Sequence, residues 1–195
     1  MIIYINMKNF ETVQGKFPIL FSAPHAFAHK RPSLVRKYKD HEEYTDRIVK
    51  DICKESKSYG IYLTSDVDYD PNYHKNENPY KKEVQRIVEE NKIKEFIDIH
   101  GLSEDHMVDV AIYYKTRFFK SIRLAEEISK VLNKGKLKGL NIQIFRLPEN
   151  GRETLTEFCA SQLRIPSVQI EIARYIREDK SLRNIFIENI SHIIK

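Results

Sequence analysis

Short apolar runs alternate with amphipathic segments along most of the chain. The runs at residues 1–6, 17–23, 60–64, 95–100, 107–114, 141–146 and 167–172 have the length and composition of strands. Segments 41–57, 79–93, 118–133, 153–163 and 180–194 repeat apolar residues at helical spacing. Strands that are mostly separated by helices predict an α/β domain with a largely parallel or mixed sheet. The one close pair of strands, 95–100 and 107–114, could be antiparallel or cross over through a short loop.

Three of these strands carry polar side chains that buried strands rarely tolerate. One leads into His25, a second holds Asp98 and ends at His100, and a third contains Glu171. Such groups are buried only when they are paired or bind a metal. Open α/β sheets place their ligands at the C-terminal ends of parallel strands. The pattern therefore predicts a shared site that holds a metal ion.

The expected helix at residues 41–57 brings a further carboxylate towards the core. Asp40 can cap this helix, and Glu43 completes a capping box three residues later. At about 100° per residue, Glu42 projects close to the apolar face, whereas Glu43 points towards solvent. His41 also lies near the inward face, so it competes with Glu42 as the inward residue.

These residue types fit a mononuclear metal hydrolase. A catalytic zinc site usually has three His, Asp or Glu ligands and one position for water, and His25, Glu42 and His100 supply such a set. The metal activates water and polarises a carbonyl while a carboxylate moves the proton, which leaves Glu171 for that work. Asp98 shares a strand face with His100 and could orient it or line the pocket. One zinc ion is expected, and another divalent metal could replace it.

Several residues near these motifs have two interpretations. Arg31 and Arg174 could each clamp a substrate carboxylate, because a planar guanidinium binds carboxylates bidentately, or form ordinary surface ion pairs. His29 could join His25 as a ligand or lie in a surface loop. A purely structural metal site would have four protein ligands and would recruit His29 or His41.

Composition narrows the class of protein. The 195 residues suit a single domain, residues 1–195. The net charge of +5 comes from 33 basic and 28 acidic residues that are interspersed without a long basic run, which weighs against nucleic acid as a partner. No apolar stretch is long enough to span a membrane, and the first residues lack the features of a signal peptide. The two cysteines have no metal-binding spacing and are expected to be buried thiols, so a cytoplasmic protein is expected.

Five motifs follow one another in the chain. They are Ser22-Ala-Pro-His25 with Arg31 after it, Lys39-Asp-His-Glu42-Glu-Tyr-Thr45, Asp70-Pro-Asn72, Phe96-Ile-Asp-Ile-His-Gly101 and Val168-Gln-Ile-Glu-Ile-Ala-Arg174. Together they resemble the N-formylglutamate amidohydrolase family and its relatives within the wider zinc-carboxypeptidase-like fold. The resemblance implies a three-layer α/β/α domain around a mixed sheet, with one catalytic zinc ion.

The resemblance also implies roles for single residues. His25, Glu42 and His100 would be the zinc ligands, and Glu171 would be the catalytic carboxylate. The residues expected to face the substrate are Arg31, Asn72 and Arg174. Members of the family hydrolyse the amide bond of an acylated or peptidyl amino acid. This chain has Pro-His-Ala-Phe where those enzymes have a Ser-Gly pair, and it lacks the arginine after Asn72, so the pocket floor is expected to differ.

The sequence therefore predicts a cytoplasmic, zinc-dependent hydrolase of an N-acyl amino acid or a small peptide-like substrate. The alternative is a relative that has kept the fold, lost catalysis and binds an acidic ligand or RNA. An RNA affinity that falls steeply with salt, in a zinc-free protein, would favour this alternative.

Overall fold

The computed structural model describes residues 4–6, 9–30, 38–39, 41–73, 77–103, 106–114, 119–146 and 154–193. Eight strands in this part of the chain form one mixed sheet, in the order β1-β2-β6-β3-β7-β10-β8-β9. Their bounds are β1 Tyr4–Asn6, β2 Phe10–Val13, β3 Phe17–Ala23, β6 Ser58–Leu63, β7 Glu95–Leu102, β8 Val110–Tyr114, β9 Ile142–Arg146 and β10 Ser167–Ala173. A separate antiparallel pair is formed by β4 His29–Lys30 and β5 Tyr38–Lys39.

The centre of the sheet is parallel. Strands β6, β3, β7 and β10 run in one direction, whereas β8 lies antiparallel beside β10. The predicted strands β7 and β8 are therefore not neighbours, because β10 is inserted between them. Since β3, β7 and β10 run in parallel, their C-terminal ends lie at one edge of the sheet. The side chains that follow or end these strands are thereby brought together.

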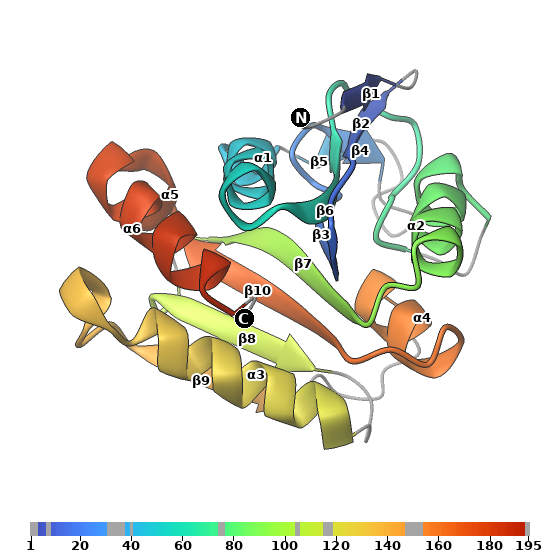
Figure 1. The fold of residues 1–195 in the computed structure, drawn as a ribbon. Helices are drawn as coiled ribbons and strands as arrows, with labels where there is room; N and C mark the ends of the chain where they lie inside the picture. Colours follow the sequence, from blue (N-terminus) through green and yellow to red (C-terminus); the bar gives the residue numbers. More distant parts are fainter. Residues whose placement is uncertain are drawn as a thin grey trace.

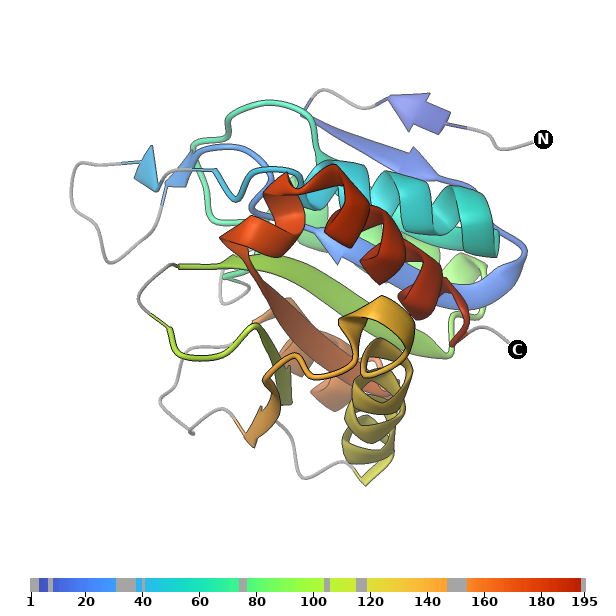
Figure 2. The same cartoon turned by 90° about the vertical axis from the view of Figure 1, so that its left-hand side faces the viewer.

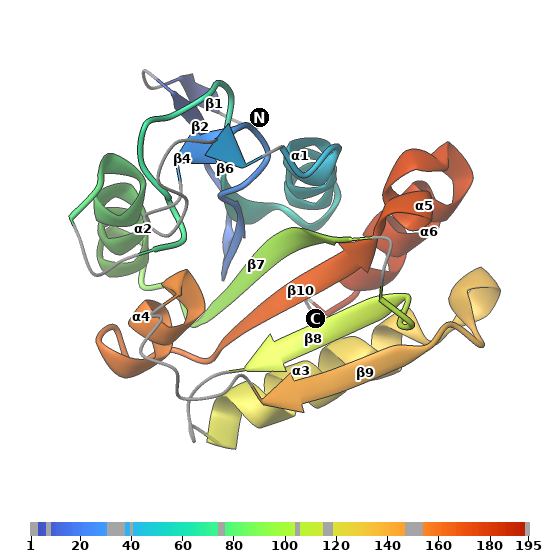
Figure 3. The ribbon, with the colours of Figure 1, turned by 180° about the vertical axis from the view of Figure 1, so that it is seen from behind.

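Helices cover both faces of the sheet, which confirms the predicted α/β layered class (Figure 1). The helices α1, α3 and α6 lie on one face and are seen in front of the sheet in Figure 2. The helices α2 and α4 lie on the opposite face, as the view from behind shows (Figure 3). The bounds of all helices are α1 Thr45–Ser56, α2 Pro79–Glu90, α3 Phe119–Leu132, α4 Leu155–Ser161, α5 Arg174–Glu178 and α6 Lys180–Ser191, with a 3-10 turn at Gly135–Leu137.

Burial on both faces explains the apolar character of the central strands. Within β7, Phe96, Ile97 and Ile99 are fully buried although successive side chains point to opposite faces. Full burial of each such side chain contributes about 1.5–3 kcal/mol relative to exposure. The polar members of the same strand therefore interrupt a well-packed core and need partners of their own.

Three elements, α1, β2 and α5, differ from the sequence-based expectation. The first central helix begins at Thr45 rather than at residue 41, because Tyr44 has a left-handed backbone (φ 67°) and acts as its N-cap without a side-chain bond. Asp40, the predicted cap, lies outside the described residues. The short elements β2 and α5 were not predicted, since each has only four or five residues.

The helix expected to begin at residue 79 and the two buried thiols are confirmed. Asn78 caps α2 by accepting a hydrogen bond from the Lys81 backbone N–H at 2.8 Å, and Pro79 occupies the first turn. Cys53 and Cys159 are buried free thiols. Among the described residues, none of the helices combines the length and the apolar character needed to span a membrane.

Candidate metal site

His25 follows β3 at the C-terminal edge of the sheet and is only 2% exposed. Its ring Nδ1 lies 3.2 Å from Glu42 Oε1, and its ring Nε2 lies 2.9 Å from Asp70 Oδ1. The backbone carbonyl of His25 also accepts a hydrogen bond from the Glu42 N–H at 2.8 Å. The His25 turn and the Glu42 turn are thus joined through both backbone and side chains.

Glu42 is buried as predicted, but it does not lie on a helix face. It lies in the turn before α1, where its carbonyl accepts a hydrogen bond from Thr45 Oγ1 at 2.8 Å. The helical projection therefore predicted the burial of Glu42 correctly, although Glu42 precedes the helix. His41, the proposed competitor, lies outside the cluster: its side chain is 53% exposed and faces Glu43 at 3.4 Å.

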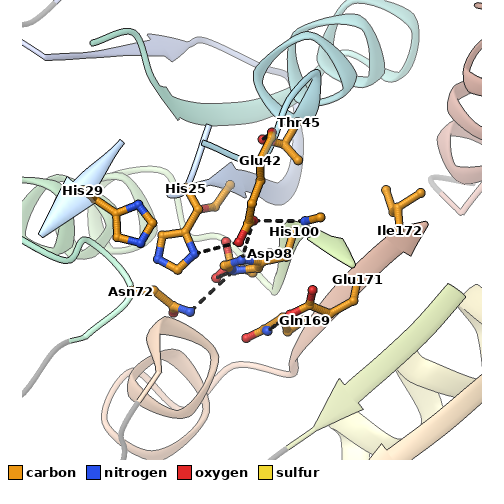
Figure 4. Close-up of polar contacts among 12 residues, drawn as sticks. His25, His29, Glu42, Thr45, Asn72, Asp98, His100, Gln169, Glu171 and Ile172 are labelled. Atoms are coloured by element: carbon orange, nitrogen blue, oxygen red, sulfur yellow. Dashed lines mark hydrogen bonds and ion pairs between the residues drawn. The ribbon is translucent and has the colours of Figure 1, made fainter. Parts of the chain in front are cut away.

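His100 lies near the end of β7 and completes the cluster (Figure 4). Its Nδ1 is 3.0 Å from Glu42 Oε2, and its Nε2 is 3.2 Å from Asp98 Oδ2. The backbone N–H of Gly101 donates to the same Glu42 oxygen at 3.0 Å. The Glu42 carboxylate is therefore held between two imidazoles and one backbone amide.

The two histidines have matching surroundings. Each directs Nδ1 to the Glu42 carboxylate and Nε2 to an aspartate, Asp70 for His25 and Asp98 for His100. The other oxygen of Asp98, Oδ1, is buried and accepts no hydrogen bond in the described part of the chain. A carboxylate on the far nitrogen of a ligating imidazole is the usual device that fixes its tautomer and orientation. The arrangement is the one expected around a metal bound through both Nδ1 atoms.

The separations of the ligand atoms suit one small divalent ion. His25, Glu42 and His100 each offer one ligand atom, and these atoms lie within 4.8 Å of one another. Two tetrahedral ligands at about 2.0–2.1 Å from one zinc ion are about 3.3–3.4 Å apart. His25 Nδ1 lies 3.2 Å from Glu42 Oε1, and His100 Nδ1 lies 3.0 Å from the other oxygen, Oε2. A set of two imidazoles and one carboxylate is typical of catalytic zinc. These residues therefore fit the ion that the sequence predicts.

Electrostatics hold the site in a charged form when no metal is bound. Burial raises the pKa of Glu42, but the charges and hydrogen bonds of His100 and His25 outweigh burial and leave this pKa well below its usual range. Burial lowers the pKa of His100, but Glu42 and Asp98 outweigh it and raise this pKa well above 6.5. The metal-free pair is thus a carboxylate and an imidazolium that keep each other charged.

Glu171 lies beside His100 on the same face of the sheet. The two residues are direct partners in the parallel register of β7 and β10, and Gln169 is likewise the partner of Asp98. Gln169 Nε2 donates a hydrogen bond of 2.7 Å to Glu171 Oε1. Figure 4 shows Glu171 and Gln169 next to the cluster formed by the histidines and Glu42.

The three residues expected to contact a substrate differ in their position relative to the cluster. Asn72 lies at the site: its Oδ1 accepts from the Leu155 N–H at 2.9 Å, and its Nδ2 lies 3.5 Å from His100 Nε2. Arg174 lies outside the cluster, where its guanidinium contacts Glu178 at 2.5 Å and Glu43 at 3.7 Å. Arg31 lies outside the described residues.

His29 packs against His25 with nearly parallel rings, 3.8 Å between centroids and 6° between planes. His25, His29 and Asp70 form a second group whose ligand atoms are close enough for a metal. However, an imidazole binds a metal along a lone pair in its ring plane, and the lone pairs of parallel stacked rings do not converge on one point. In this arrangement His29 is therefore a packing neighbour of His25.

Two residues that contact the cluster or the backbone beside it were not predicted from the sequence. Asp70 was recognised only as part of the Asp70-Pro-Asn72 motif, and its bond to His25 depends on a loop whose path the sequence does not reveal. Arg177 is 6% exposed beneath Gly101. No local signal distinguishes this arginine from the exposed ones.

Comparison with known proteins places the fold. No protein-family model matches the chain, and no curated protein matches it. Among solved structures, gene product Atu2144 from Agrobacterium tumefaciens has a TM-score of 0.69 at 12% identity, with 96% of this chain and 94% of that chain covered. Succinylglutamate desuccinylase from Vibrio parahaemolyticus has a TM-score of 0.59 at 11% identity, over 99% and 76% of the two chains.

A metallo-carboxypeptidase from Burkholderia cenocepacia also has this fold, with a TM-score of 0.61 at 10% identity over 95% of this chain. The present chain spans only 60% of the length of that carboxypeptidase. At such low identities the likeness shows the fold alone. The chain therefore has the α/β fold that a succinylglutamate desuccinylase and a metallo-carboxypeptidase share.

Proposed function

We propose that this protein is a metal-dependent hydrolase that cleaves the amide bond of an N-acyl amino acid or a small peptide-like substrate. The observation that carries the proposal is the convergence of His25 Nδ1 and His100 Nδ1 on the two oxygens of Glu42. The fold shared with a desuccinylase and a metallo-carboxypeptidase supports the same class of reaction. The resemblance of the motifs to N-formylglutamate amidohydrolases makes an acylated acidic amino acid the first substrate class to test.

His25, Glu42 and His100 would hold one zinc ion. When bound, zinc lowers the pKa of a water molecule and polarises a carbonyl oxygen. Asp70 and Asp98 would keep the two imidazoles in the tautomer that presents Nδ1, because each accepts a hydrogen bond from Nε2. The buried surroundings of these groups would strengthen every charge interaction with the substrate.

Glu171 would move the proton. Its Oε1 accepts a hydrogen bond from Gln169, which helps to hold the carboxylate on the strand beside His100. This carboxylate would take a proton from the attacking water and return it to the leaving nitrogen. The register beside His100 places this carboxylate on the strand next to the ligands. The same residue would thus be general base first and general acid second.

Two residues would contact the substrate. Asn72 has its Oδ1 bound to the Leu155 N–H, which leaves Nδ2 as the donor towards the site. Arg174 borders a hollow of about 260 Å³ whose wall also includes Ser103 and Ala173, at the ends of β7 and β10. Arg174 follows Glu171 by three residues and opens α5 directly after β10, and its guanidinium would bind the carboxylate of an amino-acid product.

The proposal is tested by metal analysis and a substrate screen on the same preparation. N-formyl, N-acetyl and N-succinyl amino acids and small dipeptides would be incubated with protein that is untreated, stripped by a chelator, or stripped and reloaded with zinc. We expect one zinc per chain and release of a free amine that is lost on stripping and restored on reloading. Zinc held by four protein ligands without turnover would contradict the proposal, as would a metal-free protein that binds RNA in a salt-dependent way.

Metal affinity is expected to rise with pH. The pKa of His100 is raised in the metal-free protein, so below that pKa the incoming ion must displace a proton from Nδ1. Each displaced proton weakens apparent affinity about tenfold per pH unit below this pKa. Because the pKa of Glu42 is lowered, this carboxylate stays ionised over the same range and adds no proton.

The stability of the metal-free protein is expected to change in the opposite direction. A raised pKa of His100 contributes stability that is complete below 6.5 and is lost as pH rises through the folded-state value. Calorimetric zinc titrations in buffers of different ionisation enthalpy count the released protons, and thermal unfolding of the stripped protein follows stability. A zinc affinity that does not change between pH 6 and 8 would contradict this interpretation.

A further inference from the structure

Arg177 lies in α5 behind the candidate site and is almost completely buried, with 6% exposure. Its Nε donates a hydrogen bond of 3.0 Å to the carbonyl of Ile172, and its Nη1 donates to the carbonyl of Glu43. The third side of the guanidinium lies against Gly101, where an added Cβ would come within 2.8 Å of Arg177 Cζ and 2.9 Å of Nη2. A single side chain therefore touches three separate segments.

Each of these three contacts is adjacent in sequence to a residue of the proposed site. Ile172 follows Glu171. Glu43 follows Glu42, and Gly101 follows His100. The contacts are with backbone, so they constrain the position of the chain itself and do not depend on the neighbouring side chains. Arg177 thereby links the turn before α1, the end of β7 and the end of β10.

The chemistry of the guanidinium suits this position. Arginine stays protonated and offers donors in a rigid planar fork, so it can bond to two carbonyls that lie in different directions. Lysine offers a compact charge on a flexible stem and cannot reproduce that geometry. The negative charge of Glu42 favours the buried cation, which offsets part of the lowering of the Arg177 pKa by burial.

A second buried arginine supports the same region. Arg183 of α6 donates through Nη1 to the Arg177 carbonyl, and its guanidinium lies 4.6 Å from the centroid of the Tyr44 ring. Tyr44 is the left-handed residue that ends the Glu42 turn and begins α1. The pair α5 and α6 therefore fixes Arg177 and the turn that carries Glu42 at the same time.

From these contacts we propose that Arg177 is a positioning residue that sets the relative placement of Glu42, His100 and Glu171. The inference rests on the proposed function, since it assigns Arg177 a task only if these residues form a metal-dependent site. A merely structural arginine would affect the stability of the fold and leave the geometry at the metal unchanged. The two possibilities differ in what a metal probe reports.

The experiment uses Co²⁺ as the probe, because its visible absorption bands depend on the geometry of its ligands. Arg177→Lys and Gly101→Ala would be compared with the unchanged protein for Co²⁺ affinity, visible spectrum, and kcat and KM. Arg177→Lys removes the guanidinium from the contact with Gly101, and Gly101→Ala adds a Cβ to it, so the two variants disturb this contact from opposite sides. Both should fold if the neighbouring side chain or backbone can shift. Ile176→Val is the control, because it removes a buried methyl group from the same helix and leaves the three Arg177 contacts unchanged.

We expect both variants to weaken Co²⁺ binding by about 10- to 100-fold, the range seen when a group that orients a metal ligand is lost. Their Co²⁺ spectra should shift and kcat should fall more than KM rises, whereas Ile176→Val should keep the original affinity and spectrum at a lower melting temperature. Unchanged affinity and spectrum in folded Arg177→Lys and Gly101→Ala, beside an unchanged protein that binds Co²⁺, overturn the inference alone. Failure of the unchanged protein to bind Co²⁺ overturns the proposed function and this inference together.

Discussion

Glu171→Gln is expected to lower kcat for amide hydrolysis by about 100- to 10,000-fold, the usual contribution of a general acid–base group. The amide keeps an oxygen that can accept from Gln169 Nε2, so the side chain should stay in place while it loses the ability to take a proton. Zinc stoichiometry should remain one per chain, because Glu171 lies on the strand beside the ligands and is not among them. Steady-state kinetics and metal analysis on the same sample measure both quantities.

Glu89→Gln is a suitable control for this substitution. It removes an exposed carboxylate that accepts a hydrogen bond from Gln85 Nε2 on α2. Its kcat should match that of the unchanged protein. Normal turnover in Glu171→Gln would show that the proton is carried by another group.

Glu42→Gln is expected to remove metal binding. Glu42 is the anionic member of the ligand set and the group that faces both imidazoles, so its loss should cost more than the roughly 10- to 100-fold seen for groups outside the ligand set. In the metal-free protein it also breaks a buried ion pair with His100. Removal of one partner of such a pair lowers the free energy of unfolding by up to about 3–5 kcal/mol.

The neighbouring Glu43→Gln provides the matched control, because its side chain is 40% exposed and contacts His41 and Arg174, which lie outside the cluster of His25, Glu42 and His100. Competition with a chromophoric chelator gives zinc affinity, and urea denaturation of stripped protein gives stability. The stability loss should be greatest at low pH, where His100 would remain protonated without its partner. Retained zinc affinity in Glu42→Gln would remove this residue from the ligand set.

The sequence indicated which residues belong to the candidate site better than it indicated how those residues are held in place. His25 and His100 stand at the ends of apolar strands and Glu171 lies inside one, where a buried polar group signals function. The structure brings the two histidines together around Glu42. The alternation of expected strands and helices along the chain also predicted the layered α/β class. These signals are local, since periodicity and strand ends can be read from a few residues.

The remaining features depend on long-range geometry that no local pattern encodes. The start of α1 was misplaced because Tyr44 takes a left-handed conformation that its residue type does not favour. Asp70 reaches His25 across 45 positions of the chain, and Arg177 reaches Glu43 across 134. The insertion of β10 between β7 and β8 likewise follows from packing of the whole sheet.

The central claim is that one divalent ion binds to His25, Glu42 and His100 and leaves a coordination position open. A crystal structure of zinc-loaded protein, with anomalous differences collected on both sides of the zinc absorption edge, tests this most directly. The account predicts one zinc peak per chain, about 2.0–2.2 Å from both Nδ1 atoms and a Glu42 oxygen, with a non-protein ligand completing the set. A peak bound instead by His29 and Asp70, a fourth protein ligand, or no peak at these residues would contradict it.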